Sequence, residues 1–156
     1  MPRLYDVTQL GAAVRTATKT VLTITAAAAK PVKVLASHIE ATDNATSFQV
    51  TAQWQKITTL GAGSDQGTTK ITKVDDGDAA ASFTVIGDIS VEPTTYDADV
   101  IREKHAGPSV IGYHSHQGPD AAPVRIEPGE TFGLVVTTAS YANTIWAASA
   151  LVAERS

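Results

Sequence analysis

The fold is decided by the stretch 123-PVRIEPGETFGLVVTTASYANTIWAASALV-152, near the end of the chain. Pro128 and Gly129 suit a tight turn, because proline presets φ and glycine accepts a positive φ without steric cost. After the turn, Phe132, Leu134 and Val136 occupy alternate positions, which is the period-2 pattern of a β-strand. A short polar break at residues 140–143 precedes another apolar segment. We therefore expect a turn followed by a closing β-hairpin.

The last segment, Thr144 to Val152, is apolar on both faces of the expected strand. Such a strand is covered on both sides in known folds. One face belongs to the core of the domain, and the other requires a second sheet or a neighbouring subunit. The residues that we expect at this contact are Trp146, Ala148 and Ala150.

Composition bounds the class of protein. A chain of 156 residues is one domain by length and buries enough surface to fold without disulfides, which the absence of cysteine excludes in any case. The net charge of −4 argues against coating a nucleic acid, which requires a basic patch. No apolar run reaches the length of a membrane span, and the first residues lack the pattern of a signal peptide. We expect a protein made in a cytoplasm, or carried in a particle assembled there.

The remaining sequence predicts an all-β fold, because threonine, valine and alanine dominate and alternation recurs. The expected strands lie at 16–25, 32–42, 46–58, 81–91, 98–104 and 109–116, in addition to the two described above. Residues 26–30 are expected to form a helical turn. About eight antiparallel strands make a β-sandwich of the jelly-roll type, in one domain spanning residues 16–156.

Residues 1–15 show weak periodicity and include Gly11. We expect them to form an extended N-terminal arm that packs on a neighbouring subunit, since chain termini are ordered only where something holds them. The apolar residues of this arm that would make the contact are Leu4, Tyr5 and Leu10.

The strongest chemical signal is the pair His114 and His116, which share one face of a strand, with Asp120 four residues further on. This resembles the first half of the cupin metal motif, which also lies in a jelly roll. The cupin motif has a glutamate where this chain has Asp120, and no histidine follows Pro128-Gly129 to supply the second half. The alternative is that these are polar residues near a loop or a subunit contact.

Two other motifs have simpler readings. The glycine-rich segment Leu60 to Lys70 lacks the glycine-lysine-hydroxyl triplet of a phosphate-binding loop, so we expect a surface loop. The acidic run Asp75 to Asp78 lacks the ligand spacing of an EF-hand, so we expect a solvated turn.

Two segments, Lys56 to Val85 and Gly118 to Ser140, resemble small bacteriophage proteins that decorate or cement capsids. In the first segment, a glycine-threonine loop leads through an acidic turn and an alanine-rich step to a strand. In the second, a proline-flanked strand and a Pro-Gly turn precede the final hairpin. The resemblance covers less than half of the chain. It implies a jelly roll, a homo-oligomer that is often a trimer, and attachment to the major capsid protein on the outside of a virion.

The expected function is therefore that of a structural protein that stabilises an icosahedral capsid, without catalysis, cofactor, nucleic acid or membrane. Two alternatives stay open. One is a cupin-like metal-dependent enzyme that uses His114, His116 and Asp120, and the other is a trimeric head domain that binds a receptor or a glycan.

Overall fold

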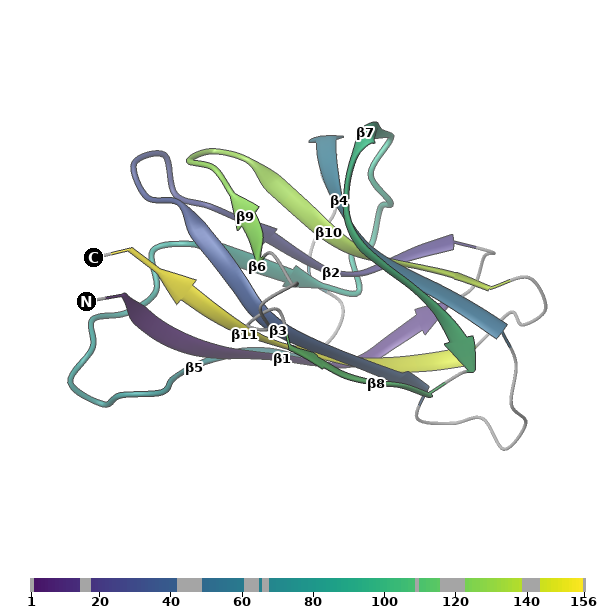
Figure 1. Cartoon of the computed structure of the whole chain (residues 1–156), viewed down its shortest axis with the longest axis horizontal. Coiled ribbons are helices and arrows are strands. Elements are labelled where there is room, and N and C mark those ends of the chain that lie inside the picture. Colours follow the sequence, from purple (N-terminus) through teal and green to yellow (C-terminus); the bar gives the residue numbers. More distant parts are fainter. Residues whose placement is uncertain are drawn as a thin grey trace.

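The chain folds into a β-sandwich, which the computed structural model describes for residues 2–14, 18–41, 49–60, 65, 68–108, 110–115, 123–138 and 144–155. Figure 1 shows its two sheets and the two chain ends, which lie side by side. The described residues form eleven strands and no helix. The prediction of an all-β sandwich is confirmed, although the number of strands exceeds the expected eight. The jelly-roll type stays a prediction.

The strands are divided between two antiparallel sheets, which we call sheet A and sheet B. Sheet A has the order β5 (Thr68–Lys73), β1 (Arg3–Val14), β11 (Thr144–Glu154), β3 (Val32–Ala41) and β8 (Val110–Ser115), with β9 (Val124–Ile126) also paired to β3. Sheet B has the order β6 (Thr84–Gly87), β2 (Thr18–Thr25), β10 (Thr131–Thr138), β4 (Gln49–Thr59) and β7 (Thr95–Pro108).

The expected closing hairpin is wrong, because its two strands belong to different sheets. Strand β10 pairs with β2 and β4 in sheet B, whereas β11 pairs with β1 and β3 in sheet A. Each strand thus turns one apolar face toward the other sheet. The turn at Pro128-Gly129 is confirmed, with a φ of 77° at Gly129, and it leads from β9 in sheet A to β10 in sheet B.

The expected N-terminal arm is also wrong for residues 3–14, which form β1 inside sheet A. This strand is paired on both sides, with β5 and with β11. Tyr5, Val7 and Gln9 are fully buried under sheet B, while Leu4 and Leu10 lie on the opposite side. The strand therefore belongs to the domain, because its inward side chains complete the core.

The core lies between the sheets and includes both tryptophans. Trp54 of β4 and Trp146 of β11 are almost completely buried. The indole Nε1 of Trp54 donates a hydrogen bond to Ser37 Oγ of β3, 3.3 Å away, and so links sheet B to sheet A. Tyr5 meets Phe83 edge to face, with ring centroids 5.3 Å apart. Each large side chain that is buried in this way stabilises the fold by about 1.5–3 kcal/mol.

Three smaller expectations need correction or qualification. Residues 26–30 contain a single turn at residues 28–29, closed by a hydrogen bond from Lys30 N to Ala27 O, and no helix longer than that turn. Part of the expected glycine-rich loop is strand β5, because the register with β1 begins at Thr68. The rest of that loop, apart from Asp65, lies outside the described residues. The acidic run 75–78 is a turn, in which Asp75 Oδ1 accepts a hydrogen bond from Gly77 N at 2.9 Å.

Candidate interaction surface

The residues of the expected metal site are described only in part. His114 belongs to β8, in register with Ser37 of β3, and nothing further is described for its side chain. His116 and Asp120 lie outside the described residues. Within the described part of the chain, no group of three or more histidine, aspartate or glutamate side chains is placed to hold a metal ion. The metal site stays a prediction.

The contact residues predicted from the sequence fall into two groups. Tyr5, Trp146, Ala148 and Ala150 lie in the core between the sheets and are at most 3% exposed. The assignment of these four to a subunit contact needs correction, because the opposite sheet already covers them. It also follows that the apolar face of β11 that includes Trp146 packs against the second sheet, which was one of the two expected partners.

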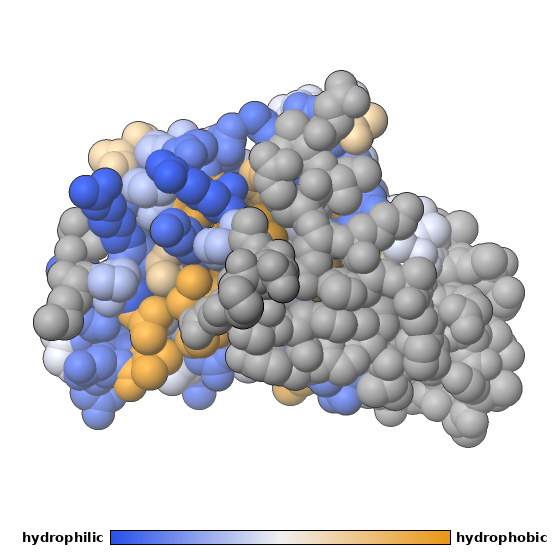
Figure 2. Space-filling view, viewed as in Figure 1, coloured by the Kyte–Doolittle hydropathy of each residue, from blue (hydrophilic) through white to orange (hydrophobic). Residues whose placement is uncertain are grey.

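Leu4 and Leu10 are the two predicted contact residues that remain at the surface. Both lie on the side of β1 that faces away from sheet B, which we call the outer face of sheet A. Leu10 is 56% exposed, and Leu4 is half-buried. Leu151 of β11 shares this face, because it stands in register with the exposed Asp6. In Figure 2, hydrophobic surface gathers toward the end of the molecule where the chain termini lie.

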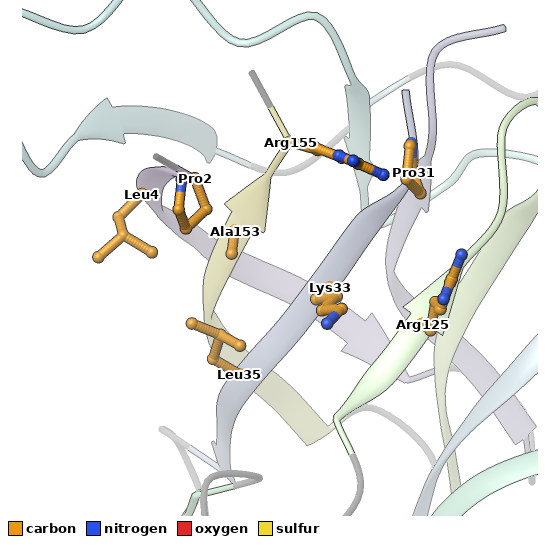
Figure 3. Close-up of a pocket in the computed structure, with 8 residues that line it drawn as sticks. All are labelled: Pro2, Leu4, Pro31, Lys33, Leu35, Arg125, Ala153 and Arg155. Atoms are coloured by element: carbon orange, nitrogen blue, oxygen red, sulfur yellow. The ribbon is translucent and has the colours of Figure 1, made fainter. Parts of the chain in front are cut away.

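A groove of about 400 Å³ lies at this end of the outer face. Four strands contribute to it, and Figure 3 shows the side chains around the hollow. The lining residues are Pro2 and Leu4 at β1, Ala153 and Arg155 at β11, Pro31, Lys33 and Leu35 at β3, and Arg125 of β9. The groove therefore combines apolar walls with three cationic side chains.

The register of the strands explains why these residues meet. Leu4 pairs with Ala153, Ala153 pairs with Lys33, and Lys33 pairs with Arg125, so one row of side chains crosses four strands. The register between β11 and β3 then shifts by one residue, and Leu35 is the extra residue at this bulge. A bulge re-aims the side chains around it, which brings Leu35 to the edge of the groove.

Two of the three cations are free for a ligand or partner. Arg125 Nε lies 2.7 Å from Glu127 Oε1, an exposed ion pair that contributes little to stability. Lys33 and Arg155 are exposed, and no carboxylate of the described residues forms an ion pair with either of them. The groove is therefore suited to an anionic partner with some apolar surface.

A second, acidic hollow of about 640 Å³ lies on the other side of Pro2 and Leu4. Its remaining lining residues follow β5 and are Val74, Asp75, Asp76 and Asp78. Val74 is 57% exposed, and Asp78 Oδ1 forms an ion pair with Arg3 Nε at 4.0 Å. Pro2 and Leu4 thus separate a cationic groove from an acidic hollow.

Buried polar groups fix this end of the sandwich. Glu154, at the end of β11, is fully buried, and its Oε1 accepts hydrogen bonds from the backbone N and the Oγ of Ser82. The Tyr5 hydroxyl donates to Ala79 O at 3.0 Å. Burial raises the pKa of Tyr5, and the charge of Glu154 raises it further. These contacts hold the segment before β6 against the ends of β1 and β11.

Sequence reasoning missed Lys33, Leu35, Arg125 and Arg155. A usable signal was present for two of them, because Lys33 stands between Val32 and Val34, and Arg125 between Val124 and Ile126. A polar residue between two apolar ones in a strand indicates an outward side chain. The pattern does not indicate that β3 and β9 are neighbours, which only the fold establishes.

Comparison with known proteins gives no further guide to this surface, since no protein family, no curated protein and no solved structure matches the chain. Among the residues that the structure describes, no helix is long and apolar enough to cross a membrane.

Proposed function

We propose that the protein is a structural subunit that acts by surface contact, and that it decorates an icosahedral phage capsid by binding the major capsid protein on the outside of the virion. The observation that carries the proposal is the outer face of sheet A, where exposed apolar residues lie together with cations that form no ion pair with the described residues. The resemblance of Lys56 to Val85 and of Gly118 to Ser140 to decoration proteins supports the capsid as the setting.

The character of the face supports a role in contact. Leu10 and Ile145 are 56% and 37% exposed on it, and Leu4, Leu35 and Leu151 are half-buried there. These apolar residues share the face with polar ones such as Asp6 and Thr8, and exposed apolar side chains gathered on one face are suited to contact with a partner. The cations at its end add selectivity and faster association with an acidic partner, more than they add affinity.

The sheet is also a suitable platform for contact under load. Strand β11, at the centre of sheet A, is paired along its length with β1 and with β3. Side chains that face outward from such a strand are held in place by the hydrogen-bonded ladders on both sides. A partner that binds there meets a surface with little freedom to lose on binding.

The test is cosedimentation with empty shells assembled from the major capsid protein of the phage that encodes the chain. We expect saturable binding by the wild-type protein and by Val91→Asp, because Val91 is exposed but lies between β6 and β7, which are both strands of sheet B. Leu35→Asp should reduce the affinity at least tenfold, which corresponds to about 1.4 kcal/mol. Absence of wild-type binding at low and at high salt would overturn the proposal.

A further inference from the structure

The two hollows at the end of sheet A carry opposite charge and share one boundary. The cationic groove, with Lys33 and Arg155, lies on the β11 and β3 side of Leu4. The acidic hollow, with Asp76 and Asp78, lies on the β5 side. Pro2 and Leu4 line both hollows and form an apolar ridge between them.

The order of the strands places these features along one line across the sheet. The line runs from the end of β5 through β1 and β11 to β3 and β9. Along it the surface changes from acidic to apolar to cationic. A surface with this order of charges is complementary to a copy of itself that is turned end for end.

A two-fold axis produces that reversal. If two copies meet through this surface and the axis runs along β1 at Leu4, the acidic hollow of each copy faces the cationic groove of the other. The two Leu4 side chains then meet at the axis. An isologous contact requires a self-complementary patch of this kind.

We propose that a second copy of this chain occupies the groove, in a reciprocal two-fold contact that pairs Lys33 and Arg155 of one copy with Asp76 and Asp78 of the other. The proposal rests on the proposed function, since it takes the outer face of sheet A as a contact surface and names a partner for it. The apolar ridge, with Val74 at its flank, supplies the area that leaves water, and the charges set the orientation.

The placement of the charges favours a two-fold contact over a ring. A head-to-tail ring needs its two complementary patches on different sides of the subunit, so that each copy contacts two neighbours. Here both patches border the same two residues, and one neighbour satisfies both. The two-fold contact therefore differs from the trimer that the resemblance implies, and it could link trimers without replacing their own interface.

The experiment uses sedimentation velocity on the protein alone, with charges reversed in pairs. The groove variant is Lys33→Glu/Arg155→Glu, and the hollow variant is Asp76→Lys/Asp78→Lys. Asp75 is left intact because it accepts the hydrogen bond that closes the turn. The control is Lys73→Glu, an exposed residue whose register partner is the inward-facing Tyr5 and which lines neither hollow.

We expect the wild type and the control to form dimers. For each charge-reversal variant alone, we expect the dissociation constant of the dimer to be at least tenfold higher. Mixing the two variants should restore a one-to-one dimer, because acidic then faces basic at both ends of the contact. This restoration also shows that both variants are folded.

A wild-type chain that stays monomeric up to about 1 mM would overturn the proposal. So would an oligomer that both reversals leave unchanged, or a mixture of the two variants that does not form the dimer. None of these results depends on capsid shells, so the failure of this contact and the failure of the proposed function are measured separately.

Discussion

Replacing Ala150 by aspartate places a carboxylate between the two sheets. Ala150 is 1% exposed, and it stands in register with the buried Val7 on one side and with Ser37 on the other. Among the described residues, no lysine, arginine or histidine side chain is buried in the core. The new carboxylate therefore loses its hydration without gaining an ion pair.

Two costs add. Extra atoms in a packed core cost about 1–3 kcal/mol, and an unpaired buried charge costs several kcal/mol more after relaxation. We expect a total of at least about 4 kcal/mol, out of the roughly 5–15 kcal/mol that stabilises a domain of ordinary stability. The loss should shrink at low pH, because a protonated carboxyl avoids most of the cost of burying a charge.

Urea unfolding followed by tryptophan fluorescence measures this loss, and Ser149→Asp is the matched control. Ser149 is the adjacent residue of β11, it points to the outer face, and it stands in register with Thr8 and His38. Its replacement should change the free energy of unfolding by no more than about 0.5 kcal/mol. If Ser149→Asp unfolded the protein and Ala150→Asp did not, the assignment of the two faces of β11 would be reversed.

Three further predictions follow from the fold. Deleting residues 1–14 should unfold the domain, because it removes β1 with the buried Tyr5 and Val7, each worth about 1.5–3 kcal/mol; a cooperative unfolding transition in the truncated chain would contradict this. Ser37→Ala should lower the free energy of unfolding by about 1–3 kcal/mol, because it removes the acceptor for Trp54 Nε1. The same substitution should lower it clearly less when Trp54 is already replaced by phenylalanine. Equal losses in the two backgrounds would show that the hydrogen bond contributes nothing. Burial raises the pKa of Tyr96 above 10.0, so the hydroxyl of the unfolded chain ionises first, and the stability that is full below about pH 10 should fall as the pH rises further. Tyr96→Phe should therefore lessen the difference between the free energies of unfolding at about pH 9 and about pH 11. An unchanged difference would contradict the assignment.

Alternation in the sequence predicted most strands well, because the faces of a strand can be read from local pattern alone. The strand expected at 32–42 is β3, and the one expected at 46–58 contains all of β4 except its last residue, Thr59. The pattern of β1 misled because it is inverted in part: the polar Gln9 is buried, whereas Leu4 and Leu10 point outward. A polar residue in the core and leucines at the surface lower the periodicity of a strand that is nevertheless central.

The assignment of strands to sheets could not be predicted from the sequence. Strands β10 and β11 follow each other along the chain with a short break, which is also the spacing of a hairpin. Only the pairing partners decide between a hairpin and a crossing to the other sheet, and those partners lie far away in sequence. The candidate surface could not be predicted for the same reason, because its residues come from the beginning, the first quarter and the last fifth of the chain.

The central claim is that the outer face of sheet A is the contact surface of the protein. Hydroxyl-radical footprinting of the wild-type chain, at concentrations below and above its self-association, tests this claim most directly. We predict that oxidation of Leu35 and Val74, which line the two hollows, falls on association, while oxidation of the exposed Val91 stays constant. Protection of Val91 with unchanged oxidation of Leu35 and Val74 would contradict the account.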